Sequence, residues 1–172
     1  MFEIDFISDS VREALLHNKL NLDAMQLAAF CDRDSELRRG EHYLFADEAS
    51  VYVASGRTEE NGAWKISSLE TYALDECDRF FVEEQLSTGR LLVRVGEETR
   101  LVACFSNECK SSVFLFVKYV ERIKKGEFSQ VDPDDRREAK FCPKCGMRYP
   151  DANRRVCPNC MEKGKQIGRA HV

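Results

Sequence analysis

Apolar and polar positions alternate over most of residues 25–105, in short runs separated by turn-forming residues. The polar stretch over 32–40 and the pair Asn61-Gly62 lie between such runs, which is typical of hairpins. The pattern predicts a meander of about seven short strands. The extended runs cover residues 25–31, 42–46, 51–55, 64–66, 69–74, 80–86, 90–95 and 100–105.

Two segments change to a helical period. Residues 9–18, after the capping residue Ser8, predict a short helix in front of the strands. A second helix is expected after the strands, capped by Ser106 or Asn107 and ended by Gly126. Its core-facing positions would be Val113, Phe116, Val117, Val120 and Ile123. A strand meander closed by one C-terminal amphipathic helix resembles the pleckstrin-homology-like arrangement, so the predicted fold class is α+β, with an antiparallel sheet or partial barrel closed by that helix.

Two Cys-x2-Cys pairs follow the second helix, eleven residues apart, and each pair has a proline after its first cysteine. Four thiolates complete the tetrahedral coordination of zinc, so the spacing predicts a small zinc ribbon whose metal is structural rather than catalytic. Two disulfides are a less favoured alternative, because a two-residue spacing strains a local bridge. The first pair also resembles a rubredoxin knuckle, which leaves an iron redox carrier as a minor alternative. The predicted ligands are Cys142, Cys145, Cys157 and Cys160.

Charge is divided unevenly along the chain. Residues 1–135 hold 16 Lys and Arg against 27 Asp and Glu, whereas residues 136–165 hold 9 against 3. An acidic body followed by a basic module argues against nucleic acid as a partner of the body, and leaves it open for the module. The acidic N-terminus does not resemble a signal peptide, and no apolar run approaches the ~18 residues of a membrane span. The chain is therefore expected to be soluble and intracellular.

Catalytic groupings are not evident in the sequence. His17, His42 and His171 lack the context of a Ser/His/Asp or Cys/His site, and no phosphate-binding loop is present. The remaining thiols are expected to be ordinary buried or half-buried groups, and the loop carboxylates are expected to be solvated. These thiols are Cys31, Cys77, Cys104 and Cys109, and these carboxylates are Asp32, Asp34, Glu36, Glu83, Glu84, Glu97 and Glu98.

The acidic body, a polar tether and the segment 141–161 together resemble the N-terminal cytosolic region of a group of bacterial ABC exporters. The resemblance implies a pleckstrin-homology-like domain over 1–126, a linker over 127–140, a zinc ribbon over 141–161 and the start of a membrane-proximal segment over 162–166. Residues 167–172 resemble a sequencing adapter translated in frame, so the natural chain is expected to be truncated there.

The same resemblance implies a non-catalytic regulatory or docking region at the cytoplasmic face of the membrane. ATP and Mg²⁺ would bind only in a missing C-terminal domain, which would couple ATP hydrolysis to export. The implied partners are the remainder of the transporter and its dimer partner, with anionic lipid headgroups as a further option for the basic module. The alternative is a free-standing zinc-ribbon adaptor that binds nucleic acid or a protein partner.

Overall fold

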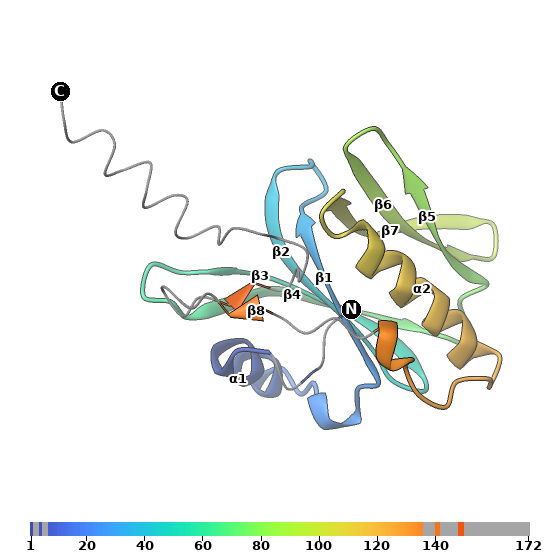
Figure 1. Cartoon of the computed structure of the whole chain (residues 1–172), viewed down its shortest axis with the longest axis horizontal. Helices are drawn as coiled ribbons and strands as arrows, with labels where there is room; N and C mark the ends of the chain where they lie inside the picture. Colours follow the sequence, from blue (N-terminus) through green and yellow to red (C-terminus); the bar gives the residue numbers. More distant parts are fainter. Residues whose placement is uncertain (2–3, 5–6, 136–139, 142–147, 150–172) are drawn as a thin grey trace.

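Seven strands form one antiparallel sheet in the order β4-β3-β2-β1-β7-β6-β5 (Figure 1). The computed structural model describes residues 1, 4, 7–135, 140–141 and 148–149. The predicted α+β class is confirmed, as a seven-stranded antiparallel sheet followed by a helix. The strands are β1 (Leu27–Arg33), β2 (Arg39–Ala46), β3 (Ser50–Thr58), β4 (Trp64–Ala73), β5 (Arg79–Glu84), β6 (Thr88–Val95) and β7 (Glu98–Ser106).

Two α-helices flank the strands along the chain, α1 (Asp9–His17) and α2 (Lys110–Lys124). Ser8 caps α1 as expected, because its hydroxyl accepts a hydrogen bond from the Val11 amide at 3.4 Å. The predicted cap of α2 is wrong: the helix begins at Lys110, and Cys109 at its N-cap makes no side-chain capping bond. Short 3-10 turns, η2 (Leu22–Ala24) and η3 (Pro133–Asp135), follow the two helices.

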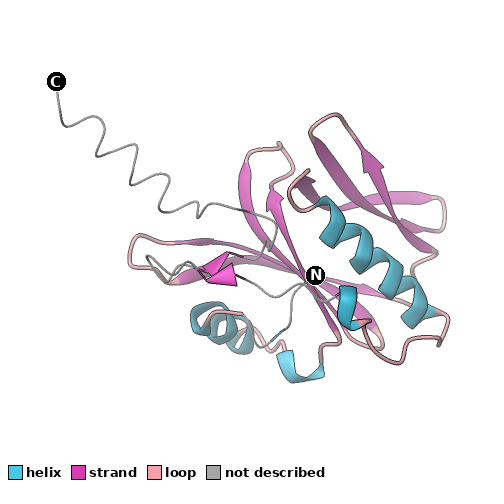
Figure 2. Cartoon of the chain, viewed as in Figure 1, coloured by secondary structure: helices cyan, strands magenta, loops and turns pink. Residues whose placement is uncertain are grey.

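Side chains on the first four strands point alternately into two separate clusters, as the period of a strand requires. In β1, Leu27 and Ala29 face the larger cluster, beneath α2, which we call the main core. Ala28 faces the smaller cluster, beneath α1. Figure 2 shows the two helices over different parts of the sheet, with α2 beside β5 to β7 and α1 beside the β3–β4 arm. Helix α2 therefore covers one face of the sheet, which we call the inner face. Helix α1 covers the opposite, outer face over β1 to β4.

Strand β1 joins the two halves of the sheet. It pairs with β2 over most of its length but with β7 at one registered position, Arg33 opposite Cys104. A bulge between Cys31 and Arg33 interrupts the β1–β2 ladder just before this junction. Bulges increase twist and redirect side chains, so the end of β1 turns toward β7.

The chain after α2 returns along that helix. Val131 is buried in the main core, and the ring of Phe128 meets the ring of Tyr119 edge to face at 6.0 Å. The Tyr119 hydroxyl donates to Asp135 at 2.6 Å and accepts from the Asp132 amide at 3.0 Å. Residues 127–135, expected to belong to a linker, thus lie against α2.

Two-residue strands β8 (Lys140–Phe141) and β9 (Arg148–Tyr149) pair on either side of residues 142–147. The remainder of the predicted ribbon and the segment 162–172 lie outside the described residues. Within the described ranges, neither α1 nor α2 has the length and apolar character needed to cross a bilayer.

Candidate functional site

The four cysteines predicted to bind zinc, Cys142, Cys145, Cys157 and Cys160, all lie outside the described residues. Their metal binding is therefore untested and stays a prediction. Across the part of the chain that the structure does describe, no group of three or more His, Cys, Asp or Glu side chains could hold a metal ion.

The other four thiols fit their predicted role as buried or half-buried groups. Cys31, Cys77 and Cys104 are buried, and Cys109 is half-buried. Burial raises the pKa of the Cys31, Cys77 and Cys104 thiols, so they stay protonated at neutral pH. Protonated thiols are poor nucleophiles and poor metal ligands, which leaves these three groups a packing role.

His42 has a defined polar partner. Its Nδ1 lies 2.7 Å from the Ser55 hydroxyl on the neighbouring strand, and its buried Nε2 has no hydrogen-bond partner among the described residues. Burial lowers the pKa of His42, although Asp34 and Glu41 act through space in the opposite direction. A nucleophile and base pair also needs a group that orients the base. In the described part of the chain no carboxylate hydrogen-bonds to His42, so the pair does not form a catalytic triad.

A hollow of about 770 Å³ opens between two hairpin loops at one end of the sheet. One loop joins β1 to β2, and the other joins β5 to β6. We call this space the hairpin hollow, and its lining residues are Arg33, Leu37, Gln85, Leu86, Ser87 and Thr88.

The β1–β2 loop is held in shape by its own first residue. The Asp34 carboxylate accepts hydrogen bonds from the backbone amides of Glu36 and Arg38, each at 2.9 Å. These bonds lower the pKa of Asp34, against the opposing effect of desolvation. Between them Leu37 adopts a φ of 63°, in the left-handed region that side chains other than glycine rarely occupy. The loop that presents Leu37 to the hairpin hollow is thus pre-organised.

Arg33 is the charged side chain that lines the hairpin hollow. Its nearest counter-ion is Asp32, whose Oδ2 lies 3.9 Å from the Arg33 Nε, beyond hydrogen-bond distance. Both Asp32 oxygens are already engaged by Ser106, one by its amide at 2.8 Å and one by its hydroxyl at 2.7 Å. The Arg33 Nε is buried and has no hydrogen-bond partner among the described residues, although the whole side chain is 29% exposed.

Two other cations near the hairpin hollow pair with carboxylates, and a third, Arg39, lies directly opposite Arg33 on β2. Arg38 contacts Asp34 at 3.2 Å and also pairs with Glu36, and Lys110 contacts Glu84 at 2.9 Å. Arg33 therefore differs from these neighbours, because its nearest carboxylate is committed elsewhere.

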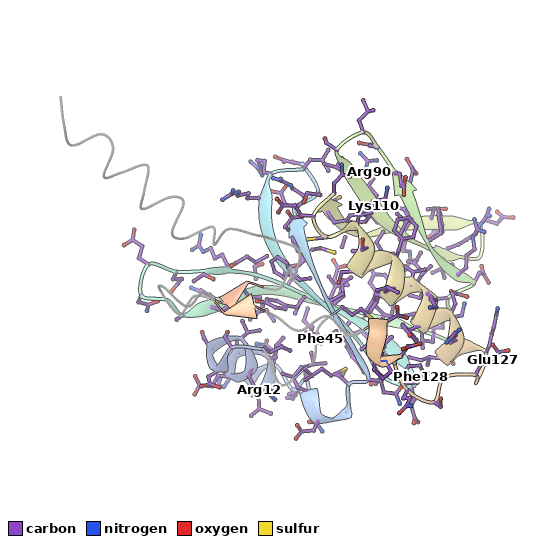
Figure 3. The ribbon with its side chains drawn as sticks, viewed as in Figure 1. Arg12, Phe45, Arg90, Lys110, Glu127 and Phe128 are labelled. Atoms are coloured by element: carbon purple, nitrogen blue, oxygen red, sulfur yellow. The ribbon has the colours of Figure 1, made fainter. Side chains whose placement is uncertain are left out.

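Arg90 lies on the same face as Arg33, two strands further along the sheet, with β7 between them. Cys104 is directly opposite Arg33 on β1 and directly opposite Arg90 on β6, and residues opposite each other point to the same face. Figure 3 shows Arg90 and Lys110 at the end of the molecule where the two hairpin loops lie. Glu83 of β5 is opposite Arg90 in turn, so Arg90 has a nearby carboxylate on its strand neighbour.

Sequence reasoning missed this site. Asp32 was expected to be solvated, which is wrong, because Ser106 binds both of its oxygens and the side chain is 23% exposed. Arg33 was not singled out at all. The signal that could have found it is an arginine next to an aspartate at the end of an apolar strand, where a charge must find a partner or a ligand.

Comparison with known proteins gives little at the level of family. No family model matches the chain, and no curated protein matches it. Among solved structures, the chain is similar to the hSac2 domain from the human phosphoinositide phosphatase Sac2, at 19% identity. The similarity covers 83% of this chain and 97% of that domain, with a TM-score of 0.45. At that score we carry nothing from the human protein to this chain.

The predicted resemblance to the cytosolic region of an ABC exporter is wrong. No family model and no curated protein, ABC transporters included, matches the chain. The residues that the structure describes also show no metal-binding cluster. Transport, ATP binding and a transporter dimer are therefore withdrawn as expectations for this chain.

Proposed function

We propose that this chain is a non-catalytic docking module that binds a partner at the hairpin hollow. The observation that carries the proposal is Arg33, which lines the hairpin hollow with a side chain that is 29% exposed and whose nearest carboxylate, Asp32, is held by Ser106. A hydrogen bond to a charged group contributes roughly 1.5–3 kcal/mol. A partner that supplies an acceptor in the hairpin hollow would pair with the exposed part of the Arg33 guanidinium.

The proposed architecture is a pleckstrin-homology-like partial barrel closed by α2. Two features support it: β1 pairs with both β2 and β7, and Val113, Phe116 and Val120 of α2 are buried in the main core. The loops of the β1–β2 and β5–β6 hairpins lie together at one end of this scaffold, and binding residues on a rigid scaffold are commonly loop residues.

The acidic balance of residues 1–135 favours some partners over others. With 16 Lys and Arg against 27 Asp and Glu, the body repels polyanions such as nucleic acid and strongly anionic membranes. A partner that presents one acceptor group to one arginine fits this balance better than a partner that needs an extended basic surface.

The test is a titration of the ¹⁵N-labelled full chain with a panel of probes followed by amide chemical shifts. The panel contains acetate, inorganic phosphate, octanoate, a single-stranded RNA oligomer and vesicles of phosphatidylcholine with phosphatidylserine. We expect saturable shifts confined to residues 33–38 and 85–90 with at least one probe, and their loss in Arg33→Gln. Shifts that are absent for every probe, or that persist unchanged in Arg33→Gln, contradict the proposal.

A further inference from the structure

We infer that the outer face of β5 to β7 binds a short acidic peptide that carries one apolar side chain. The surface is a row of apolar residues with arginines on both sides, and we call it the outer-face patch. Its residues are Arg79, Phe81, Arg90, Leu92, Arg94 and Leu101. The inference goes beyond the proposed docking function, because none of these residues lines the hairpin hollow.

Three apolar side chains form a row across the middle of the outer-face patch. Leu92 of β6 lies directly opposite both Phe81 of β5 and Leu101 of β7, so the three share a face. Its neighbours Leu91 and Val93 point into the main core, so Leu92 points outward. None of the three row residues belongs to the main core or to the cluster beneath α1, and Leu101 is 39% exposed. The row is therefore apolar surface that neither α1 nor α2 covers.

Two arginines face each other beside this row. Arg79 of β5 lies directly opposite Arg94 of β6, and both side chains are exposed. Like charges directly opposite each other destabilise a sheet. In the part of the chain that the structure describes, neither arginine forms an ion pair with a carboxylate. A carboxylate supplied by a partner would turn this repulsion into attraction.

Positive charge continues on the other side of the apolar row. Arg90 precedes Arg94 by four residues on the same face of β6, which is about 13 Å along a strand. Glu83, directly opposite Arg90, offsets one of these charges. Beyond β7, Arg33 and its opposite residue Arg39 add two more arginines. The outer face of this half of the sheet thus carries an excess of positive charge on a body that is acidic as a whole.

The spacing on β6 matches that of an extended peptide. Such a peptide directs every second side chain to one side, at intervals of about 7 Å, and β6 presents Arg90, Leu92 and Arg94 at the same interval. A peptide with acidic, apolar and acidic residues at alternate positions would place its apolar side chain on the row. One carboxylate would lie beside Arg90, and the other would lie between Arg94 and Arg79. Guanidinium and carboxylate groups form paired hydrogen bonds in this arrangement.

The same face is poorly suited to nucleic acid or to a membrane. The Arg79 guanidinium lies 4.8 Å from the centroid of the Phe81 ring, so that side of the ring is not open to a base. Residues 1–135 hold 27 Asp and Glu against 16 Lys and Arg, which repels an anionic surface that extends beyond the arginines. Salt screens charges over about 8 Å, so a peptide of about five residues is affected mainly by the arginines it touches.

The experiment titrates the ¹⁵N-labelled full chain with the peptide Glu-Ser-Leu-Ser-Glu, blocked at both ends, and follows amide chemical shifts. Gln-Ser-Leu-Ser-Gln is the matched peptide without charge, and Glu-Ser-Ser-Ser-Glu is the matched peptide without the apolar side chain. We expect the first peptide to bind about tenfold more tightly than the Gln peptide and about threefold more tightly than the Ser peptide. The shifts should centre on residues 79–81, 92–94 and 99–101.

Arg94→Glu is the decisive variant. Arg94 is exposed, and the new carboxylate would lie opposite Arg79, so an opposite-charge pair replaces a like-charge pair and the fold should be kept. Binding of the acidic peptide should weaken more than about tenfold. Arg57→Glu is the matched control, because Arg57 is an exposed arginine of β3 in the other half of the sheet, and it should weaken binding less than about twofold. Arg79→Gln, a second exposed position, should weaken binding about threefold.

The inference is overturned if the Gln peptide binds as tightly as the acidic peptide, or if Arg94→Glu and Arg57→Glu weaken binding equally. It is also overturned if single-stranded RNA or phosphatidylserine vesicles shift these amides and the peptide does not. Arg33→Gln separates this inference from the proposed function. That variant should lose the shifts at the hairpin hollow but keep peptide binding within about threefold.

Discussion

The contact between Asp32 and Ser106 should hold the two halves of the sheet together, and its removal gives the sharpest test of this fold. Between β1 and β7 one registered backbone pair is present, so side chains must supply part of the junction. Asp32 of β1 provides two hydrogen bonds, at 2.8 and 2.7 Å, to the amide and the hydroxyl of Ser106 at the end of β7. Ser106 is buried, so loss of Asp32 leaves its amide without an acceptor.

The expected cost follows from these two bonds. Each hydrogen bond to a charged group contributes roughly 1.5–3 kcal/mol, and Asp32 is partly exposed, so we take the lower end and expect Asp32→Ala to cost about 2–4 kcal/mol. Ser106→Ala keeps the amide bond and should cost about 1–2 kcal/mol. In the Asp32→Ala background the serine hydroxyl has lost its acceptor, so the double variant should show a coupling energy of about 1 kcal/mol or more.

Urea denaturation followed by the fluorescence of Trp64, the one tryptophan of the chain, measures these free energies. Asp75→Ala is the matched control, because Asp75 is exposed and makes no hydrogen bond or ion pair within the described residues. Equal stability of Asp32→Ala and Asp75→Ala would refute the reasoning. Additive effects of the Asp32 and Ser106 substitutions would also refute it, since they would show that the two groups do not interact.

Three further predictions concern other parts of the body. Burial lowers the pKa of His42, so the unfolded chain binds a proton more readily than the folded chain. The free energy of unfolding should therefore fall as pH drops through about 6.5, by up to about 1.4 kcal/mol per pH unit. Urea titrations between pH 5 and 8 measure this profile, and His42→Gln should flatten it. A Cβ at Gly56 would meet the Trp64 ring and lie 2.5 Å from the Lys65 carbonyl oxygen. Gly56→Ala should therefore lower the free energy of unfolding by about 1–3 kcal/mol. Thermal unfolding measures this change, and an unchanged melting temperature would contradict that packing. Tyr119→Phe removes the hydroxyl that binds Asp135 and the Asp132 amide, so hydrogen exchange in residues 128–135 should accelerate about tenfold while β1 to β4 keep their protection.

Most of the body could be predicted because its elements follow local periods. Alternation of apolar positions identified the strands, and helical spacing identified α2. Val113, Phe116 and Val120 are buried as expected, whereas Val117 and Ile123, also expected to face the core, are half-buried. Boundaries were less accurate where a side chain acts far along the chain. Ser106 was expected to cap α2, but its hydroxyl donates to Asp32, which lies 74 residues earlier, and accepts from the Glu108 amide just ahead of the helix.

The candidate site could not be predicted for the same physical reason. The Arg33 Nε lacks a hydrogen-bond partner among the described residues because a distant serine engages the neighbouring aspartate, and the hairpin hollow forms only where the β5–β6 loop comes near Arg33 in space. Neither fact is visible in the local pattern of residues 27–39. Composition likewise marked residues 127–135 as polar, but could not show that Val131 is buried in the main core.

The position of the site follows from how the sheet is covered. On the outer face of β1 to β4, α1 and η2 bury a cluster that includes Leu15, Phe45 and Trp64. The neighbouring row across β1, β7, β6 and β5 is instead Arg33, Cys104, Arg90 and Glu83, in which charged groups flank one buried thiol. Charged side chains cannot be buried beneath a helix without partners. The change from apolar to charged positions therefore occurs at the junction of β1 and β7, where one backbone pair and the Asp32–Ser106 contact hold the sheet. A ligand that spans the two hairpin loops would bind to residues on both sides of that junction, so ligand binding and the stability of the junction should depend on each other.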